Sequence, residues 1–412
     1  MKNQLPDCKY TLIGIDGGAT KVSGWIIRLG KKDNDFTLSA AQALLSYDTL
    51  PGFSSDFKPL PVTVQLQQRA ENSIVLTGEE IQQGQVFIEA CVRVIISLAQ
   101  KGNGKAVLVG IGMPGLKTAD QRGIIVMANG PRIPDFAAQV EAKVRQAGIL
   151  FLAPLSRLGS DADYCGIGEF YARKGLFRRI NNAYYLGGGT GAADALLLRR
   201  QLVPFDQTKN WLAKTWELKN DLGLAMERYA STSGLQFIYG SLAGLSPDEL
   251  NRKKIFPLQI ARLALKGDPA AVLAFQQVVK YLSLLLLERI TTLYSGWQAL
   301  LEFVNPAHER LTADHPYRGE VFDRIVIGQR LGELLKSEVG RKVLLNPLIR
   351  NLSDLIIDSA SLPEKIKEHY LKGERLRSRL IVCSELHEAP ALGAGIDAFI
   401  VNGIGPDKYA AN

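Results

Sequence analysis

Two glycine-rich turns, each enclosed by apolar strand-like runs, constrain the fold of this chain most strongly. The first, "LIGIDGGATKVSGWII", occupies residues 12–27, and the second, "AYYLGGGTGAADALLL", occupies residues 183–198. β-Branched and aliphatic residues on both sides of a short glycine turn are typical of a β-hairpin. Because the two hairpins start about 170 residues apart, they indicate a duplicated domain and not a short repeat.

The length and the alternation of patterns predict two α/β domains. A chain of 412 residues exceeds the usual size for one hydrophobic core. Residues 31–75 show no clear period and predict a long loop or a sheet insertion. Strands are expected at 106–115, 149–155, 324–328 and 380–385, and helices at 78–101, 161–175, 222–243, 247–266, 269–296 and from 389 onward. Such alternation indicates mixed sheets flanked by helices.

Charge and apolar runs argue against several classes of partner. The net charge is +8, but the bases are dispersed, so we expect solvated helix faces and no nucleic-acid partner. The longest aliphatic run, residues 282–287, is too short to span a membrane. The first ten residues have no apolar segment of the kind found in signal peptides, so a cytoplasmic location and no membrane partner are expected. Four scattered cysteines predict neither a disulfide framework nor a zinc site.

The first turn carries residue types that could bind phosphate. Gly18 lets backbone N–H groups approach an anion, because it has no Cβ. Thr20 adds a hydroxyl donor, Lys21 adds a cation, and Asp16 could hold a hydrated magnesium ion. Taken alone, the stretch fits a plain glycine hairpin with Asp16 as a turn residue equally well or better.

The second turn repeats this logic in the other half of the chain. It contains Gly187, Gly188, Gly189, Thr190 and Gly191. Two such turns could grip one polyphosphate from opposite sides of a cleft. The alternative for the second turn is a simple sheet bend or bulge.

Asp161 and Asn129 are the candidates for contact with a substrate. Asp161 stands at the expected start of a helix, where it could accept a proton from a hydroxyl that attacks phosphorus, or could simply cap the helix. Asp163 should diverge from it on the helix and not form an acid/base pair. The amide of Asn129 suits adjacent sugar hydroxyls, but it could equally satisfy its own turn.

The order of these motifs resembles that of ROK-type sugar kinases, which belong with actin in a superfamily of ATPases. The similarity spans about residues 16–400 and rests on seven motifs in order. They are Asp16-x-Gly18-x-Thr20-Lys21, Gly110-x-Gly112-x-Pro114-Gly115, Asp161-Ala162 with Gly168-Glu169, the glycines at 187–191, "ERYAS" (227–231), "RIVIG" (324–328) and "ALGAG" (391–395).

The resemblance implies a fold, an activity and site residues. It implies two ribonuclease H-like (actin-like ATPase) domains, 1–175 and 176–390, with a last helix at 391–412 returning to the first, and an active site in the interdomain cleft. Asp161 resembles the general base, and Asp16 the metal-associated aspartate. The phosphate motifs match Gly18, Thr20, Lys21 and Gly187, Gly188, Gly189, Thr190, with Gly328 as the adenosine-motif glycine. Asn129, Ser160 and Glu217 match sugar ligands.

The expected activity is ATP- and Mg²⁺-dependent phosphorylation of a hydroxyl on a hexose or N-acylhexosamine, as in a glucokinase. Polyphosphate is an alternative donor, and a homodimer is compatible with the resemblance. Two rivals stay open: a degenerate relative that binds sugar or nucleotide without transfer, and a sugar-responsive transcription regulator.

The chain departs from the family pattern at several positions. Ala19 replaces a usual second glycine, Ser160 replaces an asparagine, and Gln329 stands where another glycine is common. The segment "WELKNDLGLAMERYAS" lacks the cysteines and histidine of the family's zinc motif. The missing zinc motif leaves the identity of the sugar open.

Overall fold

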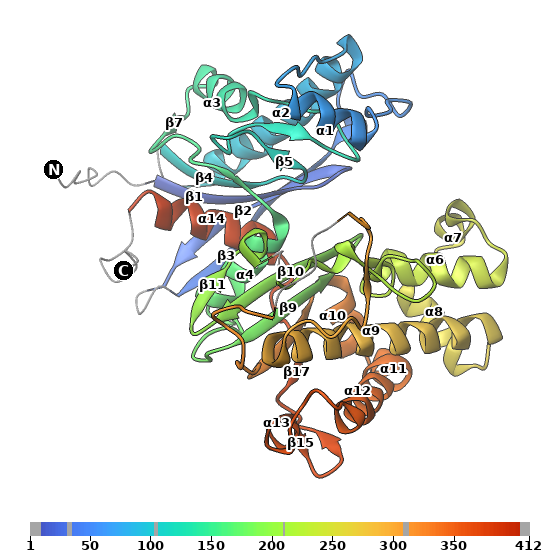
Figure 1. Ribbon diagram of the computed structural model, residues 1–412. Coiled ribbons are helices and arrows are strands. Elements are labelled where there is room, and N and C mark those ends of the chain that lie inside the picture. The colour runs from blue at the N-terminus through green and yellow to red at the C-terminus, as the bar shows by residue number, and fades with distance from the viewer. Residues whose placement is uncertain (1–9, 31–34, 103–105, 209–210, 308–312, 404–412) are drawn as a thin grey trace. The chain divides into compact units, whose positions relative to one another are not determined.

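The computed structural model describes residues 10–30, 35–102, 106–208, 211–307 and 313–403 (Figure 1). The N-terminal segment 1–9 and the expected end of the last helix at 404–412 lie outside the described residues. The chain divides into two compact units: unit 1 comprises the described parts of 1–174 and 388–412, and unit 2 those of 175–387. From the sequence, domains are expected at 1–175 and 176–390, with a last helix at 391–412.

Unit 1 is built on a mixed sheet whose central strands carry the first glycine turn. In sheet order, its strands are β3 (Phe36–Ser46), β2 (Lys21–Leu29), β1 (Tyr10–Gly17), β4 (Ala106–Gly112) and β7 (Leu150–Phe151), with β8 (Leu158–Gly159) also paired to β4. β1 and β2 form the predicted antiparallel hairpin, and β4 runs parallel to β1. The buried strand expected at 106–115 is therefore confirmed as β4, and all seven of its residues are buried.

Helices cover both faces of this sheet. The helices of unit 1 are α1 (Val62–Ala70), α2 (Gly78–Lys101), α3 (Phe136–Gln146), α4 (Asp161–Tyr171) and α14 (Ala389–Val401). Unit 1 also contains a 3-10 turn η1 (Tyr47–Thr49) and a separate small hairpin of β5 (Leu116–Lys117) and β6 (Ile124–Val126). Figure 1 shows α2 and α14 on opposite faces of the sheet. The apolar side of α2 joins Ile13 and Ile15 of β1 in one buried cluster, and its bounds agree with the helix predicted at 78–101.

The last helix, α14, packs on the sheet through glycines. A Cβ on Gly14 of β1 would lie 1.9 Å from the carbonyl oxygen of Ala391, and one on Gly110 of β4 would lie 1.8 Å from that of Ala394. Backbone therefore approaches backbone at these points, which explains why small residues dominate "APALGAG".

Replacing Gly110 with alanine is expected to destabilise unit 1 strongly. The new methyl group would collide with helix backbone and not with a flexible side chain, so the cost should reach about 3 kcal/mol or more. Thermal and urea unfolding measure this loss. Gly78→Ala serves as the control, because nothing lies within 4 Å of that position, and it should change stability little. Equal stability of both variants would contradict the packing described for α14.

Unit 2 repeats the sheet plan. In sheet order, its strands are β11 (Gln201–Val203), β10 (Ala192–Leu198), β9 (Ala183–Gly188), β14 (Arg324–Gly328) and β17 (Ile381–Cys383). β9 and β10 form the second predicted hairpin, and β14 lies parallel to both β9 and β17. The mixed sheets flanked by helices in both units confirm the predicted α/β class.

Helices make up most of the rest of unit 2. They are α5 (Phe205–Thr208), α6 (Thr232–Ala243), α7 (Pro247–Arg252), α8 (Pro257–Leu265), α9 (Pro269–Ser295), α10 (Gln329–Lys336), α11 (Glu338–Gly340), α12 (Asn346–Asp358) and α13 (Glu364–Tyr370), with short turns η2 (Thr215–Glu217), η3 (Met226–Arg228) and η4 (Arg341–Leu345). Two further pairs are β12 (Leu218–Lys219) with β13 (Glu302–Phe303), and β15 (Leu371–Lys372) with β16 (Arg375–Leu376). The long helix α9 lies in the apolar core.

Several predicted elements are wrong in extent. The helix expected at 222–243 begins only at Thr232, where the Ser231 hydroxyl accepts the N–H of Gly234 at 3.1 Å. The helix expected at 247–266 is split into α7 and α8, because Lys254 has φ +53° and Pro257 starts a new helix. The expected strand at 149–155 shrinks to the two residues of β7, and the expected helix at 161–175 ends at Tyr171.

Two helices, α2 and α9, are long and apolar enough to cross a membrane by length and composition alone. Of their most apolar windows, 61% and 56% are buried. Each contributes its apolar side to the core of its unit, as a core helix of a globular domain does.

Candidate functional site

The first glycine turn is held rigidly at the end of β1. The N–H of Gly18 donates to the Lys21 carbonyl at 2.9 Å, which closes the hairpin. Tyr47 binds the turn from outside: its hydroxyl donates to the Gly18 carbonyl at 3.0 Å and its N–H donates to the Thr20 carbonyl at 3.0 Å. These hydrogen bonds fix the conformation of the turn.

The glycines of this turn have different roles. A Cβ on Gly17 would lie 2.0 Å from Met113 Sδ, so Gly17 is required by packing. A Cβ on Gly18 would meet only the Lys21 carbonyl oxygen at 3.6 Å, which leaves its open side accessible to an anion. Ala19 and Thr20 are exposed, and Ala19 does not have a positive φ, so alanine fits the backbone there without strain.

Strand pairing brings Asp16 and Asp161 to one edge of the unit 1 sheet. Asp16 pairs with Gly112 of β4, and Gly112 pairs with Gly159 of β8, two residues before Asp161. The carboxyl ends of these parallel strands therefore lie in one row. The sequence patterns identified Asp16 and Asp161 separately, and the strand pairing shows that they lie at the same end of the sheet.

The carboxyl group of Asp16 has a raised pKa of about 7. Burial is the largest cause, and the negative charges of Asp161 and Glu388 add to it, while Lys21 opposes the shift. A cation bound here would relieve this repulsion. Among the described residues no three His, Cys, Asp or Glu side chains form a metal-binding group. Mg²⁺ fits such a sparse site, because it is commonly held by one or two carboxylates, water and substrate phosphates.

Asp161 is not the cap of its helix. Ser160 fills that position: its hydroxyl oxygen accepts the N–H of Asp163 at 3.1 Å and lies 2.8 Å from Asp163 Oδ2 as the donor. The capping alternative for Asp161 is therefore wrong, and Asp161 is an exposed first residue of α4 whose Oδ1 accepts the N–H of Ala162 at 2.9 Å. The Ser160 hydroxyl, predicted to touch a sugar, is already engaged by Asp163.

Lys117 is a charged neighbour that the sequence patterns missed. Its Nζ donates to the carbonyl oxygens of Met113 at 2.7 Å and Gly115 at 2.6 Å, in the loop that follows β4. Burial lowers its pKa to about 8, and the carboxylates of Asp161 and Asp163 oppose that shift. The one available signal was its place two residues after the Gly-x-Gly-x-Pro-Gly motif.

Asn129 lies exposed in the turn after β6, and hydrogen bonds from α1 hold the start of that turn. The buried Gln65 of α1 accepts the N–H of Met127 at 2.8 Å and donates to its carbonyl at 3.1 Å. Helix α1, absent from the sequence prediction, thus positions the loop that carries Asn129.

The second glycine turn, in unit 2, is also tied down by side chains. Its Gly189 N–H donates to Gly191 O at 2.9 Å, and the Thr232 hydroxyl donates to Gly189 O at 2.9 Å. Glu227, from the "ERYAS" motif, accepts the N–H of Ala192 at 2.9 Å through Oε1. Thr190 is exposed at the tip, whereas the glycines at 187–189 are buried.

Gly328 and Gln329 lie beside this turn. Gly328 pairs with Gly187 across the parallel strands β14 and β9, and a Cβ on it would lie 2.2 Å from the Tyr185 hydroxyl. Gln329 has φ +55°, and its side chain lies against the turn: a Cβ on Gly189 would be 2.7 Å from Gln329 Oε1. Glycine adopts this left-handed backbone at a lower cost than glutamine does.

Gln329→Gly is expected to be more stable than Gln329→Ala by about 1 kcal/mol. Both substitutions remove the side chain, but only glycine removes the cost of the left-handed backbone. Paired urea titrations of the two variants measure the difference. An alanine variant as stable as the glycine variant would show that position 329 carries no strain.

Glu217, predicted as a sugar ligand, lies in the short turn η2 of unit 2. Its Oε2 accepts the N–H of Lys214 at 2.7 Å, so one carboxylate oxygen stabilises its own turn. Of the predicted residues, Asp16, Gly18, Thr20, Lys21, Asn129, Ser160 and Asp161 thus lie in unit 1, and Gly187, Gly188, Gly189, Thr190, Glu217 and Gly328 lie in unit 2.

Comparisons with known proteins find likeness in structure only. No family model matches the sequence, and no curated protein matches it. A ROK family glucokinase from Streptomyces griseus, solved with glucose and AMPPNP, is 15% identical with a TM-score of 0.53, over 94% of this chain and 98% of that one. A ROK hexokinase from Thermus thermophilus is 17% identical with a TM-score of 0.51, over 96% and 100%.

A third neighbour is a ROK family protein from Streptococcus pneumoniae solved with sucrose. It is 13% identical with a TM-score of 0.52, over 96% of this chain and all of that one. Identities this low establish the architecture and not the activity. The chain shares the fold of the ROK-type sugar kinases, as the order of its motifs predicted.

Proposed function

We propose that this chain is an ATP-dependent kinase that phosphorylates a hydroxyl of a hexose or N-acylhexosamine. The observation that carries the proposal is the placement of Asp161. Its exposed carboxylate belongs to the first residue of α4, and it does not cap the helix, because Ser160 does so. Its negative charge raises the pKa of Asp16 at the same end of the sheet. The glucose and AMPPNP bound by the Streptomyces neighbour support this substrate class.

In the proposed mechanism, Asp161 accepts the proton of the sugar hydroxyl as that oxygen attacks the γ-phosphorus. The open side of Gly18, the Thr20 hydroxyl and the Lys21 ammonium group bind phosphate oxygens in unit 1. Gly187, Gly188, Gly189, Thr190 and Gly328 are assigned to the nucleotide in unit 2. Asn129 and Glu217 are assigned to sugar hydroxyls.

Asp16 is the proposed ligand of Mg²⁺, which would neutralise charge on the phosphates when bound.

Lys117 also takes part in the proposed mechanism. Its ammonium group, held by loop carbonyls, interacts electrostatically with Asp161. We assign Lys117 to balancing the negative charge around Asp161.

A panel of sugars with ATP and Mg²⁺, measured as ADP release, tests the proposal. Stimulation of ADP release by one sugar supports a kinase and identifies the acceptor. Sugar or nucleotide binding by calorimetry without release would instead support a degenerate relative. Replacing ATP with polyphosphate in the same panel tests the donor. The cytoplasmic location and a homodimer are part of the proposal and need fractionation and sedimentation measurements.

A further inference from the structure

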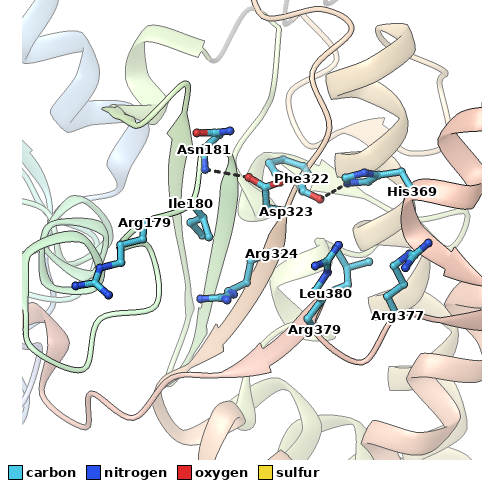
Figure 2. A pocket seen from close by; sticks show the side chains of 10 residues that line it. All are labelled: Arg179, Ile180, Asn181, Phe322, Asp323, Arg324, His369, Arg377, Arg379 and Leu380. Atoms are coloured by element: carbon cyan, nitrogen blue, oxygen red, sulfur yellow. Dashed lines mark hydrogen bonds between the residues drawn. The ribbon is translucent and has the colours of Figure 1, made fainter.

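Unit 2 has a small basic cavity far from its glycine turn. The cavity has a volume of about 250 Å³. Its lining residues are Arg179, Ile180, Asn181, Phe322, Asp323, Arg324, His369, Arg377, Arg379 and Leu380. Four arginines and a histidine thus line one hollow together with a single carboxylate. Figure 2 shows that they come from separate stretches of the chain.

The cavity lies at the opposite sheet edge from the proposed nucleotide site. Its lining residues at 179–181, 322–324 and 377–380 lie just before or at the starts of β9, β14 and β17. These three strands are parallel neighbours in the sheet. The glycines 187–189 and Gly328 follow at the other ends of β9 and β14. A six-residue strand such as β9 is about 17 to 20 Å long, so the two places cannot hold one small ligand.

The one carboxylate in the cavity is already engaged. Asp323 Oδ2 accepts the backbone N–H groups of Asn181 at 2.9 Å and Asn182 at 3.0 Å, which ties the start of β9 to β14 (Figure 2). Asp323 carries a single negative charge, so it cannot neutralise four guanidinium groups. Positive charge gathered this way repels itself and favours a bound anion.

Several donors in the cavity have no acceptor among the described residues. Arg324 is fixed by a hydrogen bond from Nη1 to the Leu176 carbonyl at 2.8 Å, but its Nε is buried without a partner among the described residues. A buried N–H of this kind is costly unless something accepts it. Arg179 and Arg379 are exposed and make no hydrogen bond or ion pair to any described residue. Arg377 is held through Nε and Nη2 by the Glu368 carbonyl at 3.3 and 3.0 Å.

We propose that this cavity is a binding site for a small phosphorylated ligand, either inorganic phosphate or a sugar phosphate. Guanidinium groups match phosphate oxygens in pairs, which makes arginine the preferred residue for this anion. The volume is below the usual range for drug-sized ligands and suits a phosphoryl group with a small body. The site is independent of the proposed kinase function, since it uses none of its residues.

Calorimetry with the full chain tests this site, with glucose 6-phosphate, inorganic phosphate and glucose as separate probes. AMPPNP and the acceptor sugar, if one is known, are present in excess to fill the proposed kinase site. We expect saturable binding of a phosphate compound and none of glucose. A preference for glucose 6-phosphate identifies a sugar phosphate as the ligand, and equal binding of both identifies the phosphoryl group alone.

Variants locate the binding. Arg179→Gln and Arg379→Gln should each weaken it by about tenfold or more, the effect of losing a charge-assisted hydrogen bond. Neither side chain makes a hydrogen bond or ion pair to a described residue, so both variants should fold as the parent does. Arg252→Gln on α7, another exposed arginine of unit 2, is the matched control and should bind as the parent does. Absence of phosphate binding, or equal binding by the Arg179→Gln/Arg379→Gln double variant and the control, would overturn the proposal. The Asp161→Asn variant should bind normally, which separates this site from the kinase proposal.

Discussion

Replacing Asp161 with asparagine is expected to lower the turnover of sugar phosphorylation by about 10²- to 10⁴-fold, the usual contribution of a general base. Asparagine keeps the shape of the side chain and cannot accept the proton. Because Ser160 supplies the helix cap, α4 should keep its stability in this variant. ADP release with the identified sugar gives the turnover, and thermal unfolding checks the fold.

Asp135→Asn is the matched control. Asp135 is an exposed aspartate at the start of α3 in the same unit, and its side chain makes no capping bond. The control should keep full turnover. Unchanged turnover in Asp161→Asn would remove Asp161 from the mechanism, and equal losses in both variants would point to a general effect on unit 1.

Asp16→Asn is expected to abolish most activity while raising stability. The loss should reach about 100-fold or more, since the variant removes the proposed ligand of Mg²⁺. The stability gain follows from the raised pKa. The folded protein binds a proton on Asp16 with a pKa of about 7 instead of the ordinary 3.8, so its stability falls as the pH rises through that interval. Above pH 7 the parent carries at most about 4 kcal/mol of this cost.

Thermal unfolding in EDTA at several pH values measures this gain. The Asp16→Asn variant should melt above the parent at pH 8, and the difference should shrink toward pH 4. Added Mg²⁺ and nucleotide should raise the melting temperature of the parent and not that of the variant. Equal melting temperatures at pH 8 would show that Asp16 is not destabilised by burial and by its acidic neighbours.

Local sequence patterns were sufficient for the elements that position the site. Both glycine hairpins, helix α2 and strands β4 and β14 follow from period and from turn residues, and their bounds agree closely with the structure. Helix α1 was missed because its sequence, "VTVQLQQRA", combines β-branched residues with three glutamines and has only one buried residue. The break between α7 and α8 depends on Pro257, which the broader helical pattern concealed.

Electrostatic relations between distant residues could not be predicted. Asp16 and Glu388 lie near opposite ends of the chain, and only the fold brings the charge of Glu388 to bear on Asp16. Lys117 follows a motif that gives no indication of burial. The sequence also left open whether Asp161 caps its helix, because serine and aspartate both favour that position, and only the hydrogen bond of Ser160 decides it.

The return of α14 to unit 1 has a consequence for biosynthesis. Unit 2 is a continuous segment inserted between two parts of unit 1. During translation, β1 and β4 are made long before α14, so the sheet face around Gly14 and Gly110 stays uncovered until unit 2 has left the ribosome. Unit 2 can complete its own core in that time. Unit 1 should therefore be the later to mature, and nascent chains stalled before residue 389 should be the ones that chaperones bind.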